Sequence, residues 1–141
     1  QALDNRPIQV YGDGTQTRCF IHVHDAVRAV RRLLDTPDAE GEIVNVGRPE
    51  EISIKHLAER VREVAGSASE ITYIPYEEAY GPGFEDMQRR TPDITKLQAT
   101  IEFEPTFSLE DILRDVIEEV TSSSDPSEAR PSPEHFDAPG S

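Results

Sequence analysis

The chain has 141 residues, with 14 Lys and Arg against 28 Asp and Glu, and a formal net charge of −14. This length fits one domain, and the charge argues against a general nucleic-acid binder, because such proteins need a basic surface to displace counterions. No apolar run approaches the ~20 residues of a membrane span, so we expect no membrane partner and a cytoplasmic location. A single cysteine, Cys19, excludes an internal disulfide and a multi-cysteine metal site.

The first part of the chain predicts two strands and a helix. Residues 8–11 are typical of a short strand, and the Gly and Asp residues of 12–15 favour a hairpin turn. Residues 16–23 then alternate as the return strand. Asp25 is the expected N-cap of an amphipathic helix over residues 25–35.

The middle of the chain predicts a second helix between two strands. Residues 42–46 read EIVNV, which favours a buried strand, and such a strand usually needs neighbours on both sides. Ser53 is the expected N-cap of a helix that ends at Gly66. Residues 71–75 favour a third strand.

The last part predicts a loop followed by two helices. The Gly and Pro residues of 76–92 indicate a loop, after which Asp93 is placed to cap a short helix that runs to about Ile101. Ser108 and Asp111 have the spacing of a capping box at the start of the final helix.

Composition divides the chain into two parts. Residues 1–120 form the predicted ordered part, a mixed α/β portion with a small sheet and amphipathic helices. Residues 121–141 are acidic and rich in Pro and Ser, which predicts a disordered tail. Phe136 is the one large apolar side chain in this tail, and we expect it to be exposed to solvent rather than buried against a partner. The chain opens on Gln1 and its strands and helices do not alternate in a complete doubly wound order. We therefore expect it to be part of a longer protein.

Two arginine sites are candidates for an anionic ligand. Arg18 follows the turn, and its forked guanidinium suits a phosphate, which the turn's backbone N–H groups could also cradle. Arg89 and Arg90 lie in the Gly- and Pro-rich loop, so the two sites could clamp a diphosphate between them. The alternative is that these arginines form ion pairs with carboxylates, including the neighbouring acids of 85–86.

The motifs of complete enzymes are absent from the sequence. It has no glycine-rich dinucleotide loop, no Walker loop and no Tyr followed four residues later by Lys, so no catalytic residue is predicted. Cys19, His22 and His24 look like metal ligands, but strand alternation places the cysteine on the face opposite both histidines. We therefore predict no metal site.

Three ordered blocks resemble the NAD-dependent nucleotide-sugar epimerases, dehydratases and decarboxylases, which are extended short-chain dehydrogenase/reductase enzymes. The first reads VYGDGTQTR and FIHVHD, the second VNVG and EISI, and the third QRRTPDITK and EPTFSL. The resemblance covers roughly residues 1–120 and, within the family, is greatest to the decarboxylases that act on UDP-glucuronate.

The resemblance implies the substrate-binding C-terminal portion of a Rossmann-type enzyme that binds a UDP-sugar or another nucleotide sugar. NAD and the catalytic Tyr-Lys pair would belong to an N-terminal part that this chain lacks, and the full-length protein would be a homodimer. The implied substrate-binding residues are Arg18 and either Arg89 or Arg90 for the diphosphate, and Val10, Tyr11 and, more weakly, Gln16 for the uridine.

The sequence also departs from the family pattern. His24 stands where an acidic residue is common, and residues 100–103, TIEF, replace the usual Leu-Gly-Trp at the end of the short helix. An alternative reading of the chain is a non-catalytic acidic α/β module that binds a partner or a nucleotide without turnover.

Overall fold

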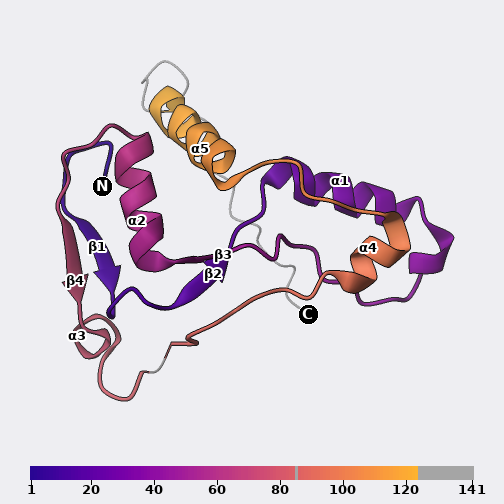
Figure 1. Cartoon of the computed structure of the whole chain (residues 1–141), viewed down its shortest axis with the longest axis horizontal. Helices are drawn as coiled ribbons and strands as arrows, with labels where there is room; N and C mark the ends of the chain where they lie inside the picture. The colour runs from indigo at the N-terminus through magenta and orange to yellow at the C-terminus, as the bar shows by residue number, and fades with distance from the viewer. Residues whose placement is uncertain (85, 124–141) are drawn as a thin grey trace, which may run out of the picture.

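The structure is a computed structural model that describes residues 1–84 and 86–123, and it is mixed α/β. Its elements in chain order are β1 (Ile8–Tyr11), β2 (Thr17–Cys19), α1 (Val23–Leu34), a 3-10 turn (Pro37–Ala39), β3 (Glu51–Ser53), α2 (Ile54–Val64), β4 (Ile71–Ile74), α3 (Tyr76–Tyr80), α4 (Thr95–Ile101) and α5 (Leu109–Ser123). Figure 1 shows β1, β4 and α2 at one end of an elongated molecule and α1 and α4 at the other, with β2 and β3 between them.

The strands form two separate sheets, so the predicted hairpin is wrong. β1 pairs with β4 in parallel, and β2 pairs with β3 in antiparallel register. The turn instead carries the chain from one sheet to the other, because Gly12 N donates to Ile74 O at 2.8 Å and Lys55 N donates to Gly14 O at 2.9 Å. The return strand is also shorter than expected, since the backbone is helical from Val23 onward.

The strand expected at residues 42–46 does not form. Val44 and Val46 pack against a buried cluster, whereas Ile43 is 88% exposed. No strand within residues 1–84 and 86–123 pairs with this segment. Its composition favours extended backbone, but a strand is defined by a ladder partner, and the described part of the chain offers none.

Helix α1 begins two residues before the expected start. His22 is its N-cap, with Nδ1 accepting from His24 N at 3.1 Å. The prediction that Asp25 caps the helix is therefore wrong, and the strand alternation assumed for His24 does not apply. In contrast, the predicted cap of α2 is confirmed, because Ser53 Oγ accepts from His56 N at 3.2 Å.

The C-terminal part departs from the prediction mainly in its loop. The predicted loop contains the short helix α3, and Ile94 rather than Asp93 is the N-cap of α4, although Asp93 Oδ1 accepts from Thr95 N at 2.9 Å. The capping box is confirmed, since Ser108 N donates to Asp111 at 2.7 Å and Asp111 N donates to Ser108 at 3.2 Å. Helix α5 continues through Ser123, and the rest of the predicted tail, with Phe136, lies outside the described residues.

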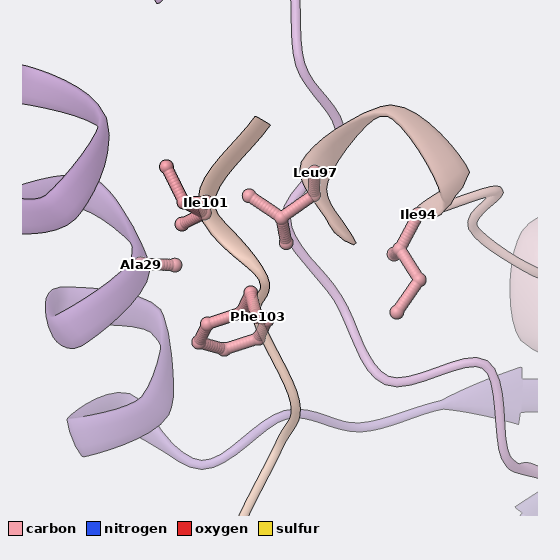
Figure 2. Close-up of a cluster of buried hydrophobic side chains, with 5 residues drawn as sticks. All are labelled: Ala29, Ile94, Leu97, Ile101 and Phe103. Carbon is pink, nitrogen blue, oxygen red and sulfur yellow. The ribbon is translucent and has the colours of Figure 1, made fainter. Parts of the chain in front are cut away.

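Two small hydrophobic clusters hold the ends of the molecule. One joins α1 to α4 and the segment after it, and its members are Ala29, Ile94, Leu97, Ile101 and Phe103. Figure 2 shows Ala29 facing Ile101 and Phe103 across this interface. The other packs β1 against α2 through Ala2, Ile8, Val10 and Ala58. Glu102 ends α4 in the left-handed conformation, with φ +48°, at the point where the sequence departs from the Leu-Gly-Trp pattern, and Phe103 fills the core.

Candidate functional site

Arg18 projects from β2 and holds the segment that follows residue 85. Its Nη1 donates to Thr17 O at 2.7 Å and to Met87 O at 2.8 Å. Its Nη2 donates to both carboxylate oxygens of Asp86 at 2.6 Å. The Arg18 side chain is 22% exposed, so this ion pair lies at a partly buried position. One member of the acidic pair suggested by the sequence, Asp86, is therefore the partner of Arg18.

The backbone joins the same two regions. Thr17 N donates to Gln88 O at 2.8 Å, and Thr17 forms an isolated parallel bridge with Arg89. The segment beyond Asp86 thus lies along the free edge of β2. This arrangement brings together the two arginine sites that the sequence places about 70 residues apart, as a clamp on a single ligand would require.

Glu51 on β3 binds side chains of both β2 and the segment that contains Arg89. It accepts from Arg89 Nε at 2.8 Å and Nη2 at 2.5 Å, from Thr91 Oγ1 at 2.7 Å and from Thr17 Oγ1 at 3.0 Å. The hydrogen bonds from Arg89 and Thr91 favour the ionised form and lower the pKa of Glu51 to about 2. Sequence reasoning missed this residue, although it lies in the second family-like block. The guanidinium of Arg89 is thus already paired with Glu51, a carboxylate of the same chain.

Arg90 differs from its neighbour because its side chain has no hydrogen bond or ion pair within the described part of the chain. It is exposed and lines a groove of about 680 Å³ that Arg18 and Arg48 also line. Arg48 is held by Glu50 and donates to Phe107 O at 2.9 Å. Three arginines therefore line the groove, and Arg90 is the one whose side chain has no hydrogen bond or ion pair among the described residues.

The three residues expected near a uridine occupy different environments. Val10 is 2% exposed and packs against α2, so its side chain belongs to the core. Tyr11 is 39% exposed and meets Tyr80 edge-on, with ring centroids 5.5 Å apart. Gln16 is 4% exposed and donates from Nε2 to Tyr11 O at 2.9 Å, while its buried Oε1 has no partner among the described residues.

An aromatic group lies next to Asp86. Tyr76 Oη donates to Asp86 Oδ2 at 3.2 Å, and the Tyr76 ring lies 5.6 Å from that of Phe84. Burial and the Asp86 charge raise the pKa of Tyr76. Gly12 lies so close to this ring that a Cβ there would be 2.5 Å from a ring carbon, at φ +74°. Gly12 is therefore required by close packing as well as by its backbone conformation. Its N–H is used by β4.

The residues that resembled metal ligands are engaged in structural contacts. His22 Nε2 forms a hydrogen bond with Asp115 at 2.8 Å, and the His22 ring stacks on Phe107 with centroids 4.1 Å apart. Across residues 1–84 and 86–123, no group of three His, Cys, Asp or Glu side chains is placed to hold a metal ion. In the same residues, no helix is long and apolar enough to span a membrane.

Comparison with known proteins identifies related enzymes. The chain is 41% identical over 117 residues to a UDP-N-acetyl-alpha-D-glucosaminuronate decarboxylase from Bacillus cytotoxicus, covering 83% of this chain and 36% of that protein. It is 35% identical over 118 residues to UDP-glucuronic acid decarboxylase 1 from Danio rerio, covering 84% of this chain and 26% of that one. A solved UDP-glucuronic acid 4-epimerase from Bacillus cereus, in complex with NAD, matches with a TM-score of 0.68 and 27% identity over 84% of this chain and 36% of that chain.

This chain spans about a third of the length of these proteins, or less. The model of the family described as GDP-mannose 4,6 dehydratase matches residues 1–116. That match covers most of the chain and includes every residue of the arginine-lined groove. The chain therefore belongs to the GDP-mannose 4,6-dehydratase family of extended short-chain dehydrogenase/reductase enzymes.

Proposed function

We propose that this chain is the nucleotide-sugar-binding part of an NAD-dependent enzyme that decarboxylates or epimerises a UDP-sugar, as a decarboxylase of UDP-glucuronate does. The observation that carries the proposal is the gathering of Arg18, Arg48 and Arg90 in one groove of a chain whose net charge is −14. Arginine side chains suit a diphosphate, because a diphosphate offers several acceptor oxygens to their forked donors.

Within this proposal, the groove assigns different roles to the two adjacent arginines. Arg90 has free donors and binds the diphosphate, together with Arg18. Arg89 holds Glu51 and so fixes the segment that presents Arg90. Each charge-assisted hydrogen bond contributes about 1.5–3 kcal/mol, and this binding energy, gained far from the reacting sugar, positions the sugar for the reaction.

The uridine is proposed to lie near the end of β1. Tyr11 offers an exposed ring there, and Val10 contributes its backbone, because its side chain is buried. Gln16 supports the same region through its hydrogen bond to Tyr11 O and retains a buried acceptor without a partner among the described residues.

The residues of this chain do not fit NAD by themselves. The sequence has no glycine-rich dinucleotide loop and no Tyr-x-x-x-Lys pair. We therefore propose that the cofactor and the proton-transferring groups belong to the portion of the relatives that this chain does not match, and that this chain alone catalyses no turnover. Dimer formation and a cytoplasmic location stay predictions of the family resemblance and the sequence.

Calorimetric titration with UDP and UDP-glucuronate tests the proposal. Arg18→Ala and Arg90→Ala are each expected to weaken binding about tenfold or more, because each removes a charge-assisted contact. The matched control is Arg62→Ala, which removes an exposed arginine from the last turn of α2, outside the groove. Unchanged affinity in both groove variants, or equal losses in the control, would contradict the proposal.

A further inference from the structure

Both terminal nitrogens of the Arg18 guanidinium donate hydrogen bonds within the chain. Each terminal nitrogen carries two hydrogens. Nη1 donates to Thr17 O at 2.7 Å and to Met87 O at 2.8 Å, and Nη2 donates to the two oxygens of Asp86 at 2.6 Å. A phosphate can therefore take the position of Asp86 at Nη2 only if that carboxylate leaves.

The acceptors differ in how easily they can leave. The carbonyls of Thr17 and Met87 belong to backbone that is fixed by β2 and by the bond from Thr17 N to Gln88 O at 2.8 Å. Asp86 is held through its side chain, which is 27% exposed and can rotate without breaking the sheet. Partly exposed ion pairs of this kind contribute little free energy, whereas a diphosphate brings more charge and more acceptor oxygens.

We propose that Asp86 occupies the diphosphate position on Arg18 while the site is empty, and that the incoming diphosphate displaces it. This inference rests on the proposed function, because it takes Arg18 as a diphosphate ligand. The displaced carboxylate keeps two other donors nearby, since Tyr76 Oη lies 3.2 Å from Oδ2 and Met87 N lies 2.8 Å from Oδ1. Asp86 thus lowers the affinity of the site for a diphosphate. It also makes the affinity depend on whether the ligand carries the charge needed to displace a carboxylate from Arg18.

The test is calorimetric titration of Asp86→Asn with UDP and with uridine. The variant removes the competing charge, so its affinity for UDP is expected to rise about three- to fivefold, in line with the strength of a partly exposed ion pair. Its affinity for uridine, which has no phosphate to compete for Arg18, is expected to stay unchanged. Asp86→Ser also removes the charge and is the substitute if the asparagine variant folds poorly. The same rise in UDP affinity is expected for it.

Two controls separate this inference from a general charge effect. Glu78→Gln removes one negative charge from α3, where Glu78 has no side-chain hydrogen bond or ion pair within the described residues. It is expected to change UDP affinity less than about twofold, because exposed charges are screened. In an Arg18→Ala background, Asp86→Asn is expected to give no gain, since Asp86 acts through Arg18.

The outcomes distinguish the two proposals. If the wild-type chain binds UDP and Asp86→Asn binds it equally or more weakly, the displacement is refuted while the proposed function stands. An equal gain for uridine and UDP would refute it too. If neither the wild type nor any Asp86 variant binds UDP or UDP-glucuronate, the proposed function fails and the inference fails with it. Binding by Asp86→Asn with none by the wild type supports the displacement.

Discussion

Replacing Asp25 with alanine is expected to remove about 3–5 kcal/mol from the free energy of unfolding. The Asp25 side chain is fully buried in the first turn of α1 and joins that helix to the segment that leads into α5. It accepts from Thr106 N at 2.9 Å, from Thr106 Oγ1 at 2.9 Å and from Phe107 N at 3.1 Å. One carboxylate therefore fixes the position of two distant segments.

The size of this loss in stability follows from the donors that lose their acceptor when the Asp25 carboxylate is removed. The two backbone N–H groups would lose their acceptor, at about 1–3 kcal/mol each if they stay buried. Arg28, at 2.5 Å, adds less, because its side chain is 39% exposed and its charge is screened by solvent. Asp25→Asn keeps an acceptor but loses the charge, so it is expected to cost less, about 1.5–3 kcal/mol.

Urea unfolding at pH 7 and at pH 3 measures the effect. Burial raises the pKa of Asp25, but the hydrogen bonds from Phe107, Arg28 and Thr106 outweigh it and hold the pKa below its ordinary value of 3.8. A lowered folded-state pKa means that the stabilisation is complete above the unfolded-state pKa and is lost as pH falls through the folded-state value. The difference between wild type and Asp25→Ala should therefore shrink at pH 3.

The control for this variant is Asp35→Ala, which removes an exposed carboxylate at the other end of α1. It is expected to change stability by less than about 0.5 kcal/mol, as surface substitutions usually do. A loss below about 1 kcal/mol for Asp25→Ala, or a loss that matches the control, would refute the reasoning, because the hydrogen bonds would then have been replaced by water at little cost.

Three further substitutions test other features of the structure. Because the folded-state pKa of Glu51 is about 2, its stabilising contribution should be lost as pH falls from about 4.5 to about 2, and acid unfolding of Glu51→Gln should lack this dependence. Gly12→Ala should lower the melting temperature more than Gly41→Ala, because both have positive φ but only at Gly12 would a Cβ meet Tyr76, and equal losses would contradict this. Glu102→Gly should raise stability by about 0.5–1 kcal/mol by relieving φ +48°, and a loss would show that the left-handed residue is unstrained.

The local signals of the sequence predicted helix ends better than strand pairing. Ser53, Gly66 and the Ser108–Asp111 box mark helix ends in the structure as expected, because a cap is decided by hydrogen bonds within about four residues. The cap of α1 was misassigned because His22 and Asp25 are both able to accept from the first turn. The burial of Asp25 beneath Thr106 decided between them, and Thr106 lies 81 residues away.

The candidate site shows the same difference between what local sequence predicts and what contacts between distant segments decide. The sequence identified the arginines and, through three ordered blocks, the family, but it left Arg89 and Arg90 equivalent. They separate once Glu51, 38 residues away in sequence, is seen to hold Arg89 while Arg90 faces the groove. Neither residue type nor spacing encodes which carboxylate an arginine meets across such a distance.

The sequence by itself therefore determined the family, the α/β class, several helix ends and the residues available for an anion. Only the tertiary structure decided that β1 pairs with β4 rather than β2, that residues 42–46 have no ladder partner in the described chain, and that Arg18 is occupied by Asp86. The physical reason is the separation in sequence between the residues that interact. Helix caps and periodicity depend on neighbours a few residues away, whereas ladders and ion pairs depend on which distant segments the packed core brings together.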